Sequence, residues 1–314
     1  MAIVADARQL AATLWGAAPK PMPRNLRRAD AEQLDPSEYV CAPKTDGERV
    51  ALVLGATEAE DRPYLVAFNR AMRGSELPLR DGVVDELGAL PRGADAFCGT
   101  LLDAERLGDG ALVVFDAVAV CGYDVRGKSF EDRLEAARPV VDALGEGVAL
   151  KRWRPLARIA EAYAEPGPPR DGVIVMPAGA AAQAPIYKWK EALKNTLDFQ
   201  WRQGAWWMAA GGRSGAPQAV GALGIEVHEV AEAHRPLEEG GIYECAPRPF
   251  ADGRRLFDVL LRRDDKTRPN HRHIVESTLV SIEEGLGLDE LVHRFAAPRS
   301  PTTAPSKRRR TADE

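Results

Sequence analysis

The chain has 314 residues, 45% of them hydrophobic, and a formal net charge of −5 at pH 7. This size and apolar content suit two domains with cores of their own, and the charge excludes a uniformly basic nucleic-acid-binding protein, so any contact with RNA or DNA must use local basic patches. Four scattered cysteines without metal-ligand spacing, no secretory signal and no apolar run of membrane-spanning length predict a nuclear, viral or cytoplasmic protein that is not secreted and uses no membrane.

The first part of the chain alternates short helices and strands. Residues 5–16 and 29–35 have helical spacing, and strands separated by turns then continue to about residue 120. The turn Lys44–Arg49 lies between two apolar stretches in this region, so we expect it to hold the amine of Lys44 at the mouth of a pocket. The alternative is a solvated turn, because Asp-Gly is a common turn pair.

Two strands carry polar or aromatic side chains that suit nucleotide binding. Asp103 and Glu105 fall on the same strand face because side chains alternate with period two, and paired carboxylates suit a divalent cation or ribose hydroxyls. Leu112–Asp116 is typical of a buried strand, and Phe115 near its end could stack on a base. The alternatives are a polar outer strand face for the two carboxylates and a core position for Phe115.

A helix and two more strands follow. Arg126–Leu144 has helical spacing, and Val173–Met176 and Ile186–Trp189 are strand-like. Asp171 stands at the start of the first of these strands, while Lys188 and Lys190 share one face of the second and could clamp phosphate groups. A charge pair on the surface is the alternative for the two lysines.

From Trp201 to about Ile282 the pattern changes to short β-type runs separated by Gly-rich turns, which favours a small five-stranded barrel of the OB-fold type. The runs are Ala219–Leu223, Ile225–Val230, Ile242–Cys245 and Leu256–Leu261. A basic loop, Arg262–Asn270, ends this segment, and a last helix is expected at Leu288–Phe295. The tail from Pro298 should be disordered, and its Lys307–Arg310 run fits a nuclear address, a phosphate contact or a solvated tail.

The turn at Lys44 also carries the strongest resemblance to known enzymes. Lys44–Arg49 matches Lys-x-Asp-Gly-x-Arg, the nucleophile motif of the covalent nucleotidyltransferases, which are DNA ligases, RNA ligases and mRNA capping enzymes. Further motifs follow in the order used across that superfamily, over roughly residues 25 to 296. They are an acidic strand with Glu105, an aromatic strand with Phe115, Asp171-Gly172, Lys188-x-Lys190 and Arg263-x-Asp265-Lys266.

Within that superfamily the details resemble mRNA capping enzymes, that is, RNA guanylyltransferases. Thr100–Glu105 is similar to their Thr-Leu-Leu-Asp-Gly-Glu, and Asp171-Gly172 matches their Asp-Gly, where ligases usually carry Glu-Gly. Lys188–Phe199 is close to their fifth motif, Arg263–Asn270 resembles their sixth, and the compact layout is similar to the monofunctional capping enzymes of chlorella viruses. The chain departs from the family at Ala104, in place of a glycine, and at Leu261, in place of a frequent arginine.

The resemblance implies a fold and a division of the chain. It implies an α+β fold, with a nucleotidyltransferase domain of antiparallel sheets over residues 1–200 and an OB-fold domain over 201–286. A C-terminal helix, 287–297, should pack back on the first domain, before a basic tail at 298–314. Since the basic loop belongs to the second domain, the two domains would have to close over the nucleotide.

The resemblance also implies a reaction and the residues that perform it. Lys44 would attack the α-phosphate of GTP and carry GMP, which then passes to a 5′-diphosphate RNA end to form the cap. Phe115 would stack on guanine, and Lys151 would reach its carbonyl. The implied catalytic residues are Lys44, Lys188, Lys190, Asp171, Arg263 and Lys266; those implied to bind GTP are Thr45, Arg49, Arg70, Glu105, Phe115, Lys151 and Asp265; Glu105 and Asp171 would hold Mg²⁺ or Mn²⁺.

Partners follow from the same resemblance. A separate RNA triphosphatase and a separate cap methyltransferase are expected, and RNA polymerase is a further candidate. Two other functions stay open on the sequence: an ATP-dependent polynucleotide ligase that carries AMP on Lys44, and a non-catalytic OB-type nucleic-acid-binding protein.

Overall fold

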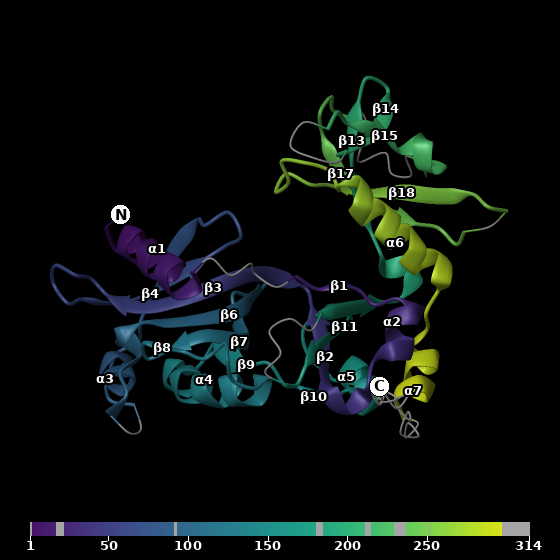
Figure 1. Cartoon of the computed structure of the whole chain (residues 1–314). Coiled ribbons are helices and arrows are strands. Elements are labelled where there is room, and N and C mark those ends of the chain that lie inside the picture. Colours follow the sequence, from purple (N-terminus) through teal and green to yellow (C-terminus); the bar gives the residue numbers. More distant parts are fainter. Residues whose placement is uncertain are drawn as a thin grey trace, which may run out of the picture.

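Three β-sheets, each packed against helices, make up the protein in this computed structural model (Figure 1). The structure describes residues 2–16, 22–90, 93–179, 185–210, 215–228, 237–250 and 252–296. Antiparallel pairing dominates all three sheets, so the α+β class predicted from the sequence is confirmed. The expected basic tail lies outside the described residues. No helix of the described ranges is both long enough and apolar enough to span a bilayer.

The first sheet is covered by helices on both faces, because its strands bury side chains on both sides. In β3 (Gly47–Ala56), Leu52 and Leu54 enter the core under α4 (Phe130–Leu144), while Val53 enters the core under α1 (Ala2–Trp15). Its other elements are β4 (Pro63–Phe68), β5 (Gly74–Leu77), β6 (Thr100–Leu107), β7 (Leu112–Val120), β8 (Tyr123–Asp124), β9 (Val148–Leu150) and α3 (Val83–Gly88).

The second sheet has one apolar face and one cationic face. Val173 and Trp189 are buried against α5 (Ile159–Ala164) and α7 (Leu288–Ala296), and Lys188 and Lys190 alternate onto the other side. Trp189 Nε1 donates a hydrogen bond to the carbonyl of Leu286 at 2.8 Å, which fixes the start of α7 here. The strand order is β1 (Arg24–Asn25), β12 (Tyr187–Lys190), β11 (Arg170–Pro177), β2 (Tyr39–Thr45) and β10 (Arg154–Pro155), with α2 (Arg28–Gln33) beside them.

The third sheet closes on itself as an OB-type barrel. Its elements are β13 (Leu197–Arg202), β14 (Ala205–Met208), β15 (Gln218–Ala219), β16 (Ile225–His228), β17 (Ile242–Pro247) and β18 (Arg255–Arg262). β15 pairs with β14 and β16 pairs in parallel with β18, so the two segments act as one interrupted strand that completes a five-stranded ring. The prediction of a strand at Ala219–Leu223 is wrong beyond Ala219, because Val220–Leu223 form a 3₁₀ turn that ends at the left-handed Gly224.

One long helix in this region was not predicted. α6 (Arg272–Glu284) follows the basic loop, and its Val275, Leu279 and Ile282 fill the barrel core at helical spacing. Its N-cap is His271, which is a weak sequence signal for a helix start. α4 also begins later than expected, at Phe130, because Ser129 caps it by accepting a hydrogen bond from the amide of Asp132.

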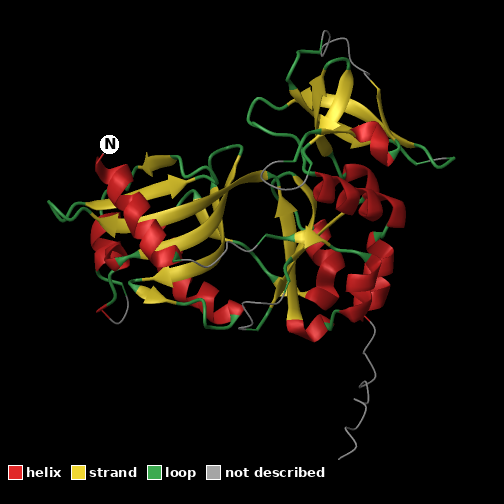
Figure 2. Ribbon diagram, turned by 45° about the horizontal axis from the view of Figure 1, so that its top comes forward, coloured by secondary structure: helices red, strands yellow, loops and turns green. Residues whose placement is uncertain are grey.

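α6 connects the barrel to the second sheet. Figures 1 and 2 show α6 running from the barrel towards α2 and α7. The amide of Arg28 donates to Glu284 Oε2 at 2.8 Å, and Asn25 Nδ2 donates to Thr278 Oγ1 at 3.5 Å. α7 then packs against α5 and α2, so the chain returns to the second sheet after the barrel.

Candidate active site

Lys44 and Lys190 lie in one row across three strands. Gly172 pairs with Lys44 of β2 on one side and with Lys190 of β12 on the other. Residues directly opposite in a sheet present their side chains to the same face, so the two amines converge over the glycine. A Cβ at Gly172 would lie 1.9 Å from the carbonyl oxygen of Trp189, and the close approach of β11 to β12 therefore depends on glycine.

The Asp171 carboxylate binds both amines. Lys44 Nζ lies 2.8 Å from Asp171 Oδ1, and Lys190 forms an ion pair with Oδ2. Burial acts to raise the pKa of the Asp171 carboxyl, but the attraction of Lys190 and Lys44 outweighs it and the net shift is downward. Asp171 is therefore ionised at neutral pH and holds the two amines side by side.

Lys188 occupies the next row on the same face. It pairs with Ile174 of β11, two residues along the strand from Lys190. Burial, reinforced by repulsion from Lys190 and Lys44, lowers the pKa of Lys188 to about 8. Among the described residues no carboxylate lies within ion-pair distance of Lys188, so this ammonium is available to an anionic ligand.

The opposite wall comes from the first sheet. Arg49 Nε donates to Asp103 Oδ1 at 2.8 Å and its Nη2 pairs with Oδ2, so the two side chains form a bidentate ion pair. Asp103 is 5% exposed, and Arg49 Cζ lies 5.5 Å from the ring centroid of Phe115. Asp116, next to Phe115, is held by Arg133 of α4 at 2.7 Å. The aromatic face and the guanidinium are thus fixed relative to each other.

A polar triangle lies at the junction of the two sheets. Lys151 Nζ donates to Thr45 Oγ1 at 2.8 Å and lies 3.4 Å from Glu105 Oε2, and Thr45 donates to the same oxygen. Burial lowers the pKa of Lys151, although Glu105 acts in the opposite direction. Thr45 directly follows Lys44, so the triangle also fixes the end of β2.

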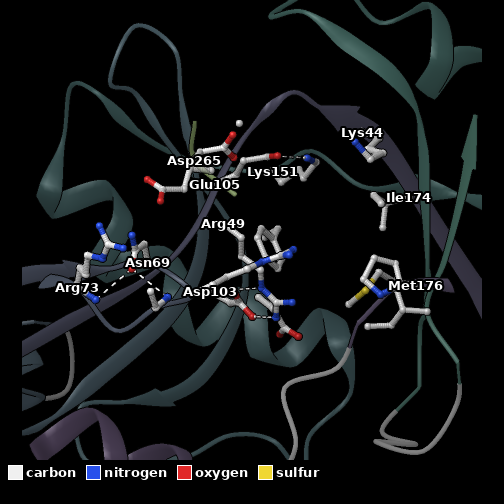
Figure 3. A pocket seen from close by; sticks show the side chains of 18 of the residues that line it. Lys44, Arg49, Asn69, Arg73, Asp103, Glu105, Lys151, Ile174, Met176 and Asp265 are labelled. Atoms are coloured by element: carbon white, nitrogen blue, oxygen red, sulfur yellow. Dashed lines mark hydrogen bonds and ion pairs between the residues drawn. The ribbon is translucent and has the colours of Figure 1, made fainter. Parts of the chain in front are cut away.

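A cavity of about 780 Å³ separates the two walls. Figure 3 shows Lys44 and Met176 on one side of it, opposite Arg49 and Asn69. Of the residues predicted for the site, the cavity is lined by Lys44, Arg49, Arg70, Glu105, Phe115, Lys151, Arg263, Asp265 and Lys266. Asp171, Lys188, Lys190 and Thr45 are not among its lining residues. Asp171 and Thr45 contact residues that are, namely Lys44 and Glu105, and Lys190 is joined to Lys44 through Asp171.

Arg70 sits on a loop that Asn69 shapes. Asn69 Oδ1 accepts hydrogen bonds from the amides of Ala71 and Arg73, both at 3.0 Å, which closes the turn. The turn directs Arg70 and Arg73 to the cavity, and Arg70 is close enough to contribute to the lowered pKa of Lys188. The cavity therefore has cations on both walls.

The basic loop of the barrel reaches the same cavity, because Arg263, Asp265 and Lys266 line it. Arg263 is engaged within its own domain: its guanidinium lies 2.8 Å from Asp265, 3.0 Å from Glu244 and 3.2 Å from Asp198. These contacts hold Arg263 at the rim of the cavity. No phosphate contact is possible through the edge that faces Asp265 until that carboxylate moves.

Several residues of the cavity were not predicted in the place that they occupy. Asp103 was predicted, with Glu105, as a carboxylate for a divalent cation or ribose hydroxyls, but it binds Arg49, and this partnership depends on the strand register. Asn69 and Arg73 flank the predicted Arg70. Trp153, Ile174, Met176 and Ile186 supply apolar lining, and no local pattern distinguishes such residues from core positions.

The residues present are compatible with a hard divalent cation that takes most of its ligands from phosphate. Glu105 and Asp171 offer carboxylate oxygens, and Asp171 Oδ1 is buried without a directed hydrogen bond, although Lys44 lies nearby. The described ranges contain no group of three His, Cys, Asp or Glu side chains arranged to hold a metal. Mg²⁺ commonly binds through one or two carboxylates plus substrate phosphates, which fits this donor set.

Comparison with known proteins gives partial matches to solved structures. No protein-family model matches the chain. A Lig E DNA ligase aligns with 12% identity and a TM-score of 0.35, over 78% of this chain and 100% of the ligase. A structure named Pmar-Lig_PreS3 aligns with 15% identity and a TM-score of 0.37, over 77% of this chain and 66% of that one.

An archaeal ATP-dependent RNA ligase aligns with 18% identity and a TM-score of 0.34, over 57% of this chain and 49% of the ligase.

Proposed function

We propose that this protein is a covalent nucleotidyltransferase that carries a nucleoside monophosphate on Lys44. The observation that carries the proposal is the convergence of Lys44 and Lys190 over Gly172, with Asp171 between the two amines. A nucleophilic lysine beside a second cation can attack an α-phosphate whose developing charge the neighbour stabilises. Lys44 also lines the cavity, opposite Arg49 and Phe115, as a nucleophile for a bound nucleotide must.

The chemistry proceeds in two displacements. The unprotonated Lys44 amine forms a P–N bond with the α-phosphorus, the bond from that phosphorus to the bridging oxygen breaks, and pyrophosphate leaves with the electron pair. Asp171 is the carboxylate in place to receive the proton of the amine. In the second step a terminal phosphate oxygen of the acceptor forms a P–O bond, the P–N bond breaks, and Lys44 recovers a proton.

The other residues would position the nucleotide and neutralise the charge of its phosphates. Lys188 and Lys190, on the same face of the sheet as Lys44, would bind the α-phosphate, while Arg49 and Arg70 on the opposite wall would bind phosphate or ribose oxygens. A divalent cation bound to the phosphates and one carboxylate would withdraw charge from the reacting phosphorus. Asp171 and Glu105 are the residues that would hold it.

The finer form of the proposal is an mRNA guanylyltransferase. The nucleotide would be GTP and the acceptor a 5′-diphosphate RNA, which together give the 5′–5′ triphosphate cap. Support comes from Phe115, whose ring lines the cavity, and from Lys151, whose buried ammonium could donate to the guanine carbonyl. The RNA triphosphatase and the cap methyltransferase would then be separate proteins, with RNA polymerase as a candidate docking partner.

An ATP-dependent polynucleotide ligase is the second candidate, because the Lys44 chemistry is the same with AMP in place of GMP. One experiment separates the candidates. The purified protein is incubated with Mg²⁺ and each of the four α-³²P-labelled nucleoside triphosphates, and then run on a denaturing gel. We expect an acid-labile, alkali-stable label from GTP. Label from ATP alone favours the ligase, and no label from any nucleotide rejects both proposals.

A further inference from the structure

The basic loop owes its position to a residue that does not line the cavity. Asp198, in β13, bridges the two cations of the loop: Oδ1 lies 3.2 Å from Arg263 Nη1, and Oδ2 lies 3.2 Å from Lys266 Nζ. The two oxygens of one carboxylate therefore set the spacing between the two cations. Both cations line the cavity and Asp198 does not, so Asp198 stands behind them.

The backbone of Asp198 anchors the far end of the same loop. Its amide donates to Asn270 Oδ1 at 2.8 Å, and its carbonyl accepts from the amide of Asn270, also at 2.8 Å. The near end of the loop is tied separately, because the amide of Arg263 donates to the carbonyl of Ile242 at 2.8 Å. The loop from Arg263 to Asn270 is thus held at both ends and, through Lys266, in its middle.

The anchor itself is rigid. Asp198 is 7% exposed, and its neighbour Phe199 is fully buried, with its ring packed edge-on against Phe257 at a centroid distance of 5.9 Å. A buried carboxylate is stable when cations satisfy it, and the loop supplies two. Asp265 also binds Arg263, but the Asp265 side chain is 63% exposed. An anion can therefore displace Asp265 from Arg263 while the ion pair with Asp198 remains.

We propose that Asp198 is a positioning residue for nucleotidyl transfer, which it serves by aiming Arg263 and Lys266 at the leaving pyrophosphate. The inference rests on the proposed function. Asp198 holds Arg263 through Nη1, so the Nε–Nη2 edge, now on Asp265, is the edge that exchanges to phosphate. The effect belongs to the first chemical step, because pyrophosphate is absent when the acceptor takes the nucleotide.

The test is Asp198→Asn, which keeps the shape and removes the charge. In single-turnover labelling over a range of nucleotide concentrations, the maximal rate of adduct formation should fall by about tenfold to a hundredfold, as expected when hydrogen bonds to charged groups are lost. The half-saturating nucleotide concentration should change by less than about threefold, since the first domain holds the nucleotide. Transfer from preformed adduct to the acceptor should stay within about threefold of wild type.

Asp258→Asn is the matched control. Asp258 belongs to the same barrel and binds Arg248 at 2.6 Å, and neither residue lines the cavity. This control should leave the adduct rate unchanged, and thermal unfolding of both variants separates a loss of stability from a loss of rate. If Asp198→Asn does not fold, Asn270→Ala removes the other half of the anchor and should give the same selective loss of maximal rate.

A double-mutant cycle distinguishes positioning from general damage. In an Arg263→Ala, Lys266→Ala background, Asp198→Asn should lower the residual adduct rate by less than about twofold, because the groups it acts through are gone. A full loss in that background, or a normal maximal rate for Asp198→Asn alone, overturns the inference. A wild-type protein that takes no label fails the proposed function instead, so the two failures are distinguishable.

Discussion

Lys44 and Lys190 contact the two oxygens of one carboxylate, Asp171, from neighbouring strands on either side of it. Lys44 Nζ lies 2.8 Å from Oδ1, and Lys190 pairs with Oδ2. One negative charge therefore holds two amines together that would otherwise repel each other. In the proposed reaction a nucleotide phosphate would replace part of this attraction, so that Lys44 reacts while Lys190 stays on the phosphate.

The first prediction concerns the nucleophile. Lys44→Ala and Lys44→Arg should both abolish covalent labelling, because alanine has no amine and the guanidinium of arginine stays protonated. Both variants should remain folded, since Lys44 lines the cavity and Asp171 keeps Lys190 as a partner. Lys194→Ala is the control: Lys194 pairs with Glu191 outside the cavity and its loss should leave labelling intact. Label that survives in either Lys44 variant would place the nucleophile elsewhere.

The second prediction concerns Gly172. Gly172→Ala places a Cβ 1.9 Å from the Trp189 carbonyl oxygen, so β11 and β12 must separate. We expect a loss of stability of at least about 1–3 kcal/mol, the usual cost of overpacking, together with a loss of adduct formation as Lys190 moves away from Lys44. Gly179→Ala has open space around its Cβ and serves as the control for both measurements. Normal stability and labelling in Gly172→Ala would contradict the row geometry.

The third prediction concerns pH. The lowered pKa of Lys188, about 8, means that the free protein loses this positive charge as the pH rises through that value. A bound phosphate favours the ammonium, so binding takes up a proton and affinity should fall above pH of about 8. Titration calorimetry with a non-reactive α,β-methylene nucleotide measures this change in affinity directly. The series should run from a pH of about 7 to about 9.5, which is roughly one unit or more on either side of the pKa of Lys188.

Lys188→Arg is the matched variant for the pH series, because its guanidinium keeps the charge throughout. Its affinity for the same nucleotide should show a smaller decline over the same range. Parallel declines in the wild type and in Lys188→Arg would assign the titration to another group.

The fourth prediction concerns base recognition. Phe115→Ala should weaken binding of GTP by about 1–3 kcal/mol, the usual contribution of base–aromatic stacking. Tyr123→Ala, at a position 76% exposed on β8, removes an aromatic ring outside the cavity and should not change affinity. GTP should be strongly preferred to ATP in the wild type. Equal labelling by the two nucleotides would count against guanylyl transfer.

The fifth prediction concerns the barrel. Arg263→Ala and Lys266→Ala should suppress adduct formation by orders of magnitude, because their cations are expected to orient the pyrophosphate, while the nucleotide still binds through the first domain. Arg254→Ala removes an exposed arginine of the same barrel that pairs with Glu226, and should be neutral. If a double variant of Arg263 and Lys266 forms adduct at the wild-type rate, the loop is only a solvated basic surface.

Much of the fold is local and was accessible from the sequence. The period-two alternation around Lys188 and Lys190 predicted their common face. The short β-type runs after Trp201 predicted β16, β17 and β18, but not β13 or β14. α6 was missed although its core residues, such as Val275 and Leu279, have helical spacing, because His271 is a weak signal for a helix start. The end of the strand at Ala219 was not predicted, because a strand and the 3₁₀ turn that follows it differ there only in backbone angles.

The sequence by itself determined which groups are available to the site: the motif lysines, the acids and Phe115 are named by type and order. Only the tertiary structure decided which of them meet. The pairing of Arg49 with Asp103, and of Asp198 with Arg263, joins residues 54 and 65 positions apart. Such contacts depend on strand register and barrel closure, which are set by packing of the whole chain and leave no local periodicity in the sequence.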